Sequence, residues 1–193
     1  MSFTDLLRDY GLWGVLIGTF FEGEGVMLMA GGLAHQQIVS PWGAWLIGAL
    51  GAYLGHLVHY GLGYFLRGKN FLNLIPRWRP KIERALPFIR RYPVWSIFVM
   101  QYLYGVRIVG AVAMGLAGMP WLLFFTIQSI NCLIWSAVIF VFGYGATAAV
   151  SLLFPWSDRG IVTLLIAVLL ATAVLYFFIG RGGRWGIKSE PEG

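Results

Sequence analysis

Long apolar segments separated by short polar stretches make up most of the chain. The segments lie at residues 11–34, 42–66, 94–118, 121–149 and 161–179. A transmembrane helix needs about 20 mainly apolar residues, and each segment is close to or above that length. Tryptophans at several segment ends are typical of a membrane–water interface. The pattern predicts an all-α integral membrane protein with one polytopic domain over residues 1–180.

Two of the segments are broken near their middle by polar residues and glycines. Glu22-Gly-Glu-Gly25 interrupts residues 11–34, and residues 94–118 carry Gln101 and Arg107 beside two glycines. Such breaks are tolerated at membrane depth only where protein or water covers them. Each arm, with about nine residues at 1.5 Å per residue, reaches about half-way through a bilayer. We therefore predict two re-entrant hairpins, at 11–34 and at 94–118.

Basic residues set the expected topology. Eight of the 14 Lys and Arg residues lie in the loop at 67–93: Arg67, Lys69, Arg77, Arg79, Lys81, Arg84, Arg90 and Arg91. The positive-inside rule places both this loop and the weaker basic tail at 181–193 in the cytoplasm. Three apolar segments lie between them, and three full crossings would leave the tail outside. One of the three must therefore enter and leave the membrane on the same side. Apolar residues recur at helical spacing in the loop. We expect a membrane-surface helix, interrupted by Pro76, Pro80 and Pro87, with anionic lipid headgroups as its partner.

The order of the segments suggests a duplicated unit. Each predicted hairpin is followed by a continuous span, at 42–66 or at 121–149, and a further span is expected at 161–179. One crossing between the two units gives them opposite orientations. This is the inverted-repeat plan of many transporters, and we predict it here.

Composition excludes several classes of protein. Hydrophobic residues make up 59% of the chain and charged residues only 11%, against about a quarter in soluble proteins. The mean hydropathy is +0.74. Because the basic loop carries much of the net charge of +6, we expect lipid rather than nucleic acid as its partner. The single cysteine, Cys132, excludes a disulfide framework and a cysteine-based metal cluster, and no motif predicts a metal, a cofactor or an enzyme.

Glu22, Glu24 and Arg107 are the strongest functional candidates, because ionisable groups within an apolar segment are costly unless they are paired or wet. We expect the two hairpins to meet near the midplane, with these side chains lining one polar cavity. Arg107 would bind a phosphate through its planar fork of donors, and the carboxylates would bind and release protons. The alternative is that both breaks are shallow and their charges reach the headgroups.

Further polar residues lie on the two continuous spans. His56 and His59, at i and i+3, are candidates for a proton relay, the alternative being two hydrogen-bonded structural histidines. They lack a third metal ligand, so no metal site is predicted. Gln128, Asn131 and Trp135 share a face of the 121–149 segment, and we expect Asn131 to hydrogen-bond the hairpin backbone.

An ordered set of motifs resembles one bacterial family. The set comprises Phe21-Glu-Gly-Glu24, Ala30-Gly-Gly-Leu-Ala34, Gly55-His56 with Tyr60 and Gly63, Tyr104-Gly-Val-Arg107 with Gly115, and Asn131 with Trp135. It is similar to the DedA family of VTT or SNARE-associated-like membrane proteins, especially the small YohD-like branch. The resemblance covers about residues 10–145.

The resemblance implies a multi-pass protein of the bacterial inner membrane with two opposed re-entrant hairpins. It implies a lipid transporter or flippase that moves undecaprenyl phosphate or phospholipid between leaflets, coupled to protons. Carried over residue by residue, it places the family's hairpin acids on Glu22 and Glu24 and its second hairpin arginine on Arg107. We therefore expect substrate binding at Gln101, Tyr104, Gly105 and Arg107, and proton coupling at Glu22, Glu24, His56 and His59. Gln101 stands where the family has an arginine, and His56 where it has an aspartate.

Two other functions stay open at this point. One is a non-transporting membrane scaffold or stress adaptor, and the other is an energy-independent phospholipid scramblase. An intramembrane hydrolase would need a nucleophile beside a base, and the sequence suggests none, so no enzyme is expected. The expected partners are a phospholipid or polyprenyl phosphate, protons and anionic headgroups, and a homo-oligomer stays open.

Overall fold

The computed structural model describes residues 3–21, 23–67, 79–102 and 107–153. These residues form helices and no strand, which confirms the predicted all-α class. The helices are α1 (Phe3–Phe21), α2 (Gly23–His35), α3 (Pro41–Phe65), α5 (Arg79–Arg91), α6 (Pro93–Tyr102), α7 (Arg107–Ala117) and α8 (Trp121–Leu153). The predicted span at 161–179, the tail at 181–193 and residues 68–78 of the basic loop lie outside the described residues.

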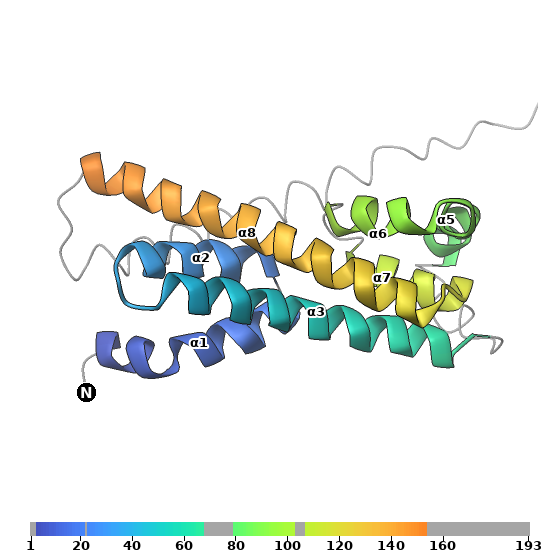
Figure 1. Cartoon of the computed structure of the whole chain (residues 1–193), viewed down its shortest axis with the longest axis horizontal. Coiled ribbons are helices and arrows are strands. Elements are labelled where there is room, and N and C mark those ends of the chain that lie inside the picture. The colour runs from blue at the N-terminus through green and yellow to red at the C-terminus, as the bar shows by residue number, and fades with distance from the viewer. Residues whose placement is uncertain (1–2, 22, 68–78, 103–106, 154–193) are drawn as a thin grey trace, which may run out of the picture.

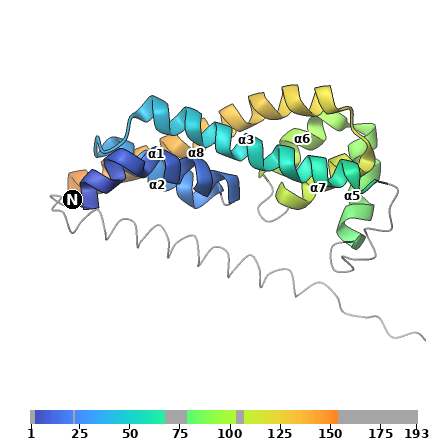
Figure 2. The same cartoon turned by 90° about the horizontal axis from the view of Figure 1, so that it is seen from below.

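Two long helices run along the molecule, and a pair of short helices packs at each end of them. Figure 1 shows α1 and α2 at the end where the N-terminus lies, with α5, α6 and α7 at the opposite end. The view turned by 90° shows the same two groups at opposite ends, with α3 and α8 running alongside both (Figure 2). We call α1 with α2 the first pair and α6 with α7 the second pair. In each pair the chain runs to the middle of the molecule and back, so both breaks face the centre.

The two short helices that precede the long ones end in the same way. After α2, Gln37 adopts a φ of 58°, and after α7, Gly118 adopts a φ of 74°. In both places the N–H of that residue and the next N–H bond to carbonyls three and five positions earlier, which is a Schellman motif. Proline and tryptophan then follow, as Pro41-Trp42 and as Pro120-Trp121. The matching ends direct the chain from each short helix into a long one.

Four glycines bring helices from opposite ends of the chain into backbone contact. Gly31 of α2 and Gly143 of α8 face each other, as do Gly115 of α7 and Gly63 of α3. A Cβ atom added at any of the four glycines would first meet a backbone carbonyl oxygen of the partner helix. In each case that oxygen belongs to the residue three positions before the partner glycine. The α2–α8 and α3–α7 contacts therefore have the same local geometry, and a side chain at any of these glycines would meet rigid backbone.

The helix in the basic loop differs from the one expected. α5 runs without interruption from Arg79 to Arg91 through Pro80 and Pro87. Pro80 lies in the first turn, where the N–H has no helical partner in any case. Pro87 costs a hydrogen bond, but Ile82 and Ile89 are buried against the second pair and hold the helix on both sides of it. The predicted interruption at Pro87 is therefore wrong, whereas Pro80 lies where the described helix begins.

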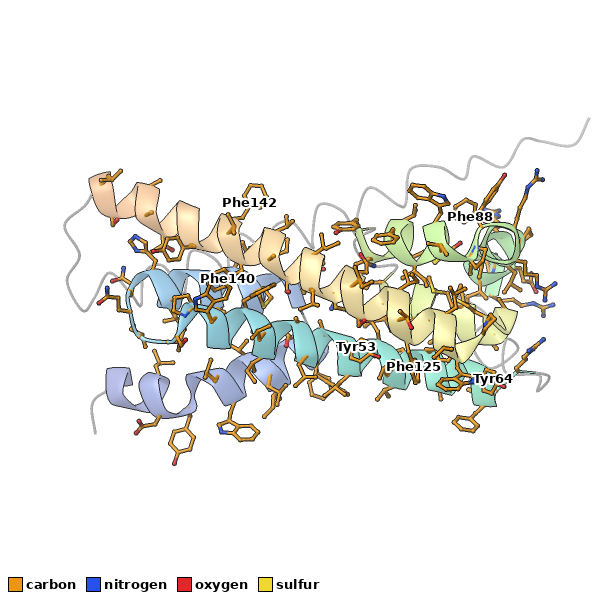
Figure 3. All side chains as sticks on the ribbon, in the orientation of Figure 1. Tyr53, Tyr64, Phe88, Phe125, Phe140 and Phe142 are labelled. Carbon is orange, nitrogen blue, oxygen red and sulfur yellow. The ribbon has the colours of Figure 1, made fainter. Side chains whose placement is uncertain are left out.

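One helix among the described residues, Trp121–Leu152, has the length and hydropathy needed to cross a membrane, and Arg107–Ala117 is a shorter apolar helix. α3 has sufficient length, but its glycines and histidines lower its hydropathy. On α8, Phe142 points away from the other helices while Phe140 is buried against them (Figure 3). Large apolar side chains such as Leu122, Val141 and Phe142 are thus exposed, as lipid-facing positions would be.

Candidate functional site

The two helix breaks meet at an ion pair. Glu24 is the second residue of α2 and Arg107 is the first residue of α7, so each lies where its helix begins in the middle of the molecule. Nη1 of Arg107 donates to Oε1 of Glu24 at 3.3 Å. The Arg107 side chain is 11% exposed and that of Glu24 27%. The pair therefore joins the first and second helix pairs at a largely buried position.

An aromatic ring completes the surroundings of the guanidinium. The central carbon of the Arg107 guanidinium lies 4.9 Å from the ring centroid of Trp135, a buried residue of α8. A cation at this distance from an indole face is attracted by the ring quadrupole. Gly23 makes room for this packing, because a Cβ there would lie 2.5 Å from the Trp135 ring and 2.7 Å from Nη1 of Arg107. Three helices thus fix the position of one positive charge.

A small cavity lies beside Arg107. Its polar lining comes from Arg107, His56 of α3, Gln101 of α6 and Gln128 of α8. The apolar lining comes from Ile97, Met100, Ala111, Met114 and Phe124. The space of about 10 Å³ is enough for about one water molecule. The structure therefore brings together side chains that are far apart in the sequence around a polar interior space.

Gln128 orients the amide of Gln101. Nε2 of Gln128 donates to Oε1 of Gln101 at 3.0 Å and to Sγ of Cys132 at 3.3 Å. Gln101 and Gln128 are both buried. Asn131, one turn further along α8, donates from Nδ2 to the carbonyl oxygen of Ile97 at 3.1 Å. α8 is therefore connected to α6 by a polar side-chain contact and by a bond to its backbone.

The two histidines of α3 have different surroundings. Nδ1 of His56 lies 2.6 Å from the carbonyl oxygen of Ala52, and Nδ1 of His59 lies 2.6 Å from that of Gly55. A carbonyl only accepts, so Nδ1 carries a proton in both rings, and in the neutral form of either ring Nε2 is an acceptor. His56 lines the cavity, whereas His59 does not. The sequence offered both as equivalent candidates, and the structure separates them.

Some predicted residues cannot be placed, and some residues of the site were not predicted. Glu22, Tyr104 and Gly105 lie outside the described residues. The spacing of Trp135 from Gln128 and Asn131 predicted that the three share one helix face, but it did not predict that Trp135 would contact Arg107. Nothing in the sequence indicated that Gly23 would pack against an arginine more than eighty positions away.

The described residues contain no group of three or more His, Cys, Asp or Glu side chains that could hold a metal ion. They do contain a largely buried guanidinium, that of Arg107, which pairs with Glu24 and lies over the ring of Trp135. A guanidinium offers several donors in a planar fork that suits carboxylates and phosphates alike. The site is chemically equipped to bind an anionic oxygen group.

Comparison with known proteins gives the family. A family model described as the VTT domain matches residues 21–145, which is more than half of the chain. The chain belongs to the VTT-domain family, the DedA family. The matched region of this VTT-domain protein contains both helix breaks and the cavity residues. The family resemblance seen in the motifs is thereby confirmed.

Three relatives are similar to this VTT-domain protein. It is 29% identical to the inner membrane protein YohD of Escherichia coli over 100% of its own length and 98% of the relative. It is 24% identical to the Escherichia coli inner membrane protein YabI over 71% of its length and 54% of the relative. An uncharacterized membrane protein of Buchnera aphidicola is 24% identical over 74% of this chain and 60% of the relative. No solved structure matches the chain. These matches confirm the predicted location in the bacterial inner membrane.

Proposed function

We propose that this VTT-domain protein moves an anionic lipid, undecaprenyl phosphate or a phospholipid, between the leaflets of the inner membrane and couples the movement to protons. The observation that carries the proposal is the largely buried Glu24–Arg107 ion pair between the two helix breaks. An ion pair in such a place costs desolvation energy that a well-packed apolar contact would not. A function that needs the charges is a physical reason to keep them.

The mechanism follows from competition for one cation. A phosphate oxygen presents the same charge and acceptor atoms to Arg107 as the Glu24 carboxylate does. When Glu24 takes up a proton, it loses the charge that attracts the guanidinium, and a phosphate can replace it. Loss of the proton restores the ion pair and expels the phosphate. Proton binding at Glu24 and anion binding at Arg107 therefore favour each other, as transport of both together requires.

For the membrane topology we propose two opposed re-entrant hairpins related by an inverted repeat, with the first pair and α3 forming one unit and the second pair and α8 the other. The matched glycine contacts support this proposal, because exchanging the units converts the α2–α8 contact into the α7–α3 contact. The shared helix ends, with positive φ and a following Pro-Trp, also support it. Under this topology the Glu24–Arg107 pair lies near the midplane, within reach of both leaflets.

The basic helix α5 supports a role with anionic lipids. Arg84, Arg90 and Arg91 are exposed, whereas Ile82 and Ile89 on the opposite side are buried. We propose that this helix lies at the cytoplasmic membrane surface and gathers anionic headgroups beside the second pair. Each basic residue near an anionic surface contributes about 1 kcal/mol, so the helix would raise the local concentration of substrate.

The test is a lipid-flip assay with purified protein in phosphatidylcholine vesicles. Tail-labelled phosphatidylglycerol, tail-labelled phosphatidylcholine and a labelled polyprenyl phosphate are compared with and without a pH gradient. We expect one of the anionic lipids to cross faster than phosphatidylcholine and to respond to the gradient. Equal rates for all three lipids without response to pH would identify a scramblase, and absence of any movement would favour a scaffold.

A further inference from the structure

Two residues that line the cavity beside Arg107 each carry a buried polar atom, and the two atoms have opposite hydrogen-bonding character. Nε2 of Gln101 is a donor, and Nε2 of His56 is an acceptor because Nδ1 of that ring carries the proton. Within the described part of the chain neither atom has a hydrogen-bond partner. The residues are 3% and 6% exposed. A buried polar atom without a partner loses its hydrogen bonds to water and gains none in return, so both atoms call for a ligand.

Among the described residues, the side chains that line the cavity do not supply that ligand. Gln128 directs both of its N–H groups elsewhere, one to Oε1 of Gln101 and one to Sγ of Cys132. Arg107 can only donate, and its Nη1 is engaged by Glu24. The remaining lining is apolar. A group that satisfies both atoms must accept from Gln101 and donate to His56, and it must be about the size of one water molecule.

We propose that one ordered water molecule binds in this cavity and bridges Gln101 of α6 to His56 of α3. Both atoms belong to residues that line the same cavity, and its space of about 10 Å³ matches one water molecule. The bridge extends hydrogen bonding from the surroundings of Arg107 to His56. His59, which makes the same bond to its own helix but lies outside the cavity, has no such connection.

The role of the water rests on the proposed function, although its presence does not. An anion bound to Arg107 would lie next to this water, and the water would link it to the ring nitrogen of His56. The proposal therefore assigns the relay role to His56 and withholds it from His59. The groups that face His56 are Arg107 of α7, Gln101 of α6, Gln128 and Cys132 of α8, and His59 on its own helix.

Nitrogen NMR of the intact protein tests the water site directly. The protein is labelled with 15N-histidine in phosphatidylcholine nanodiscs, and the three histidine signals are assigned with His35→Asn and His59→Asn. We expect magnetisation transfer from water protons to Nε2 of His56 and the chemical shift of a hydrogen-bonded acceptor nitrogen. The transfer should be lost in Gln101→Leu, while the His59 signal, the matched control on the same helix, stays unchanged.

The outcomes separate this site from the proposed function. A wild-type His56 without water transfer, or a Gln101→Leu protein that keeps it, overturns the water bridge; the wild-type measurement decides even if the variant does not fold. Inorganic phosphate is then added to the wild-type sample. A His56 signal that keeps its water transfer but does not respond to phosphate supports the water site and counts against Arg107 as a phosphate ligand.

Discussion

Replacing Arg107 gives the sharpest test of the proposed function. Its contacts in the structure allow the expected loss of stability and of transport to be estimated. Arg107→Ala deletes the bond to Glu24 and the stacking on Trp135. A hydrogen bond to a charged group contributes about 1.5–3 kcal/mol, and a cation on an aromatic face about 0.5–2 kcal/mol. We therefore expect the free energy of unfolding to fall by about 2–4 kcal/mol. The loss should stay below the roughly 5 kcal/mol that breaking a fully buried pair can cost, because the Glu24 side chain is partly exposed.

Transport should fall for a separate reason. An anion that loses one charged hydrogen-bond donor worth about 1.5–3 kcal/mol binds about ten- to a hundredfold more weakly. Arg107→Lys keeps the charge but loses the planar fork, so it should retain part of the activity. We expect the order wild type, Arg107→Lys, Arg107→Ala in flip rate of the anionic lipid.

The assay combines flip rates in vesicles with thermal unfolding in detergent, and the chain contains its own control. Arg79 also pairs with a glutamate, Glu83, at 2.7 Å, but both side chains are about half exposed. An exposed pair contributes about 0–1 kcal/mol, so Glu83→Gln, which breaks this pair from the acidic side, should change stability little and leave the flip rate intact. A normally stable Arg107→Ala protein that flips anionic lipid at the wild-type rate would refute the phosphate-ligand role and favour a scaffold.

Three further predictions follow from the site, the glycine contacts and the topology. Glu24→Gln removes the competing charge at every pH, so anionic lipid flipping should lose its increase at low pH; a vesicle assay across pH that shows the wild-type profile would move proton coupling to another residue. Gly63→Ala should lower the unfolding temperature because its Cβ meets backbone, whereas Gly61→Ala, with open space, should leave it unchanged or raise it. Cysteines introduced at Lys69 and Lys188 should react with a membrane-impermeant reagent from the same side, and labelling from opposite sides would add a fifth full crossing.

Much of the fold follows from hydropathy, but the selection among site residues does not. Polar residues with glycines indicated both helix breaks, because an apolar segment tolerates such residues only where protein or water covers them. Glu24 and Arg107 were expected to line one cavity; the structure instead joins them in an ion pair, and of the two only Arg107 lines the cavity. The difference between His56 and His59 was not predictable, since a spacing of three places both on one helix face. Only the neighbouring helices decide which ring meets the cavity.

The continuous α5 illustrates a second limit. Proline signals in the loop were interpreted as interruptions because local propensity is what a single sequence reveals. Ile82 and Ile89 hold the helix against the second pair, and this packing energy exceeds the cost of one missing hydrogen bond at Pro87. Tertiary contacts of this kind override local propensity and leave no signature in the segment itself.

The ion pair also has a consequence for the order in which the protein is made. Glu24 and Arg107 are 83 positions apart, so at roughly 5–20 residues per second about 4–17 s pass between their synthesis. During this interval the carboxylate has emerged without its guanidinium, and Gly31 has emerged without the α8 backbone that it packs against. The nascent first pair therefore lacks its contacts with α7 and α8 until those helices exist. Under the topology proposed above, we expect this acidic, half-assembled helix pair to wait at the membrane surface or beside an insertion factor until the second half of the chain arrives.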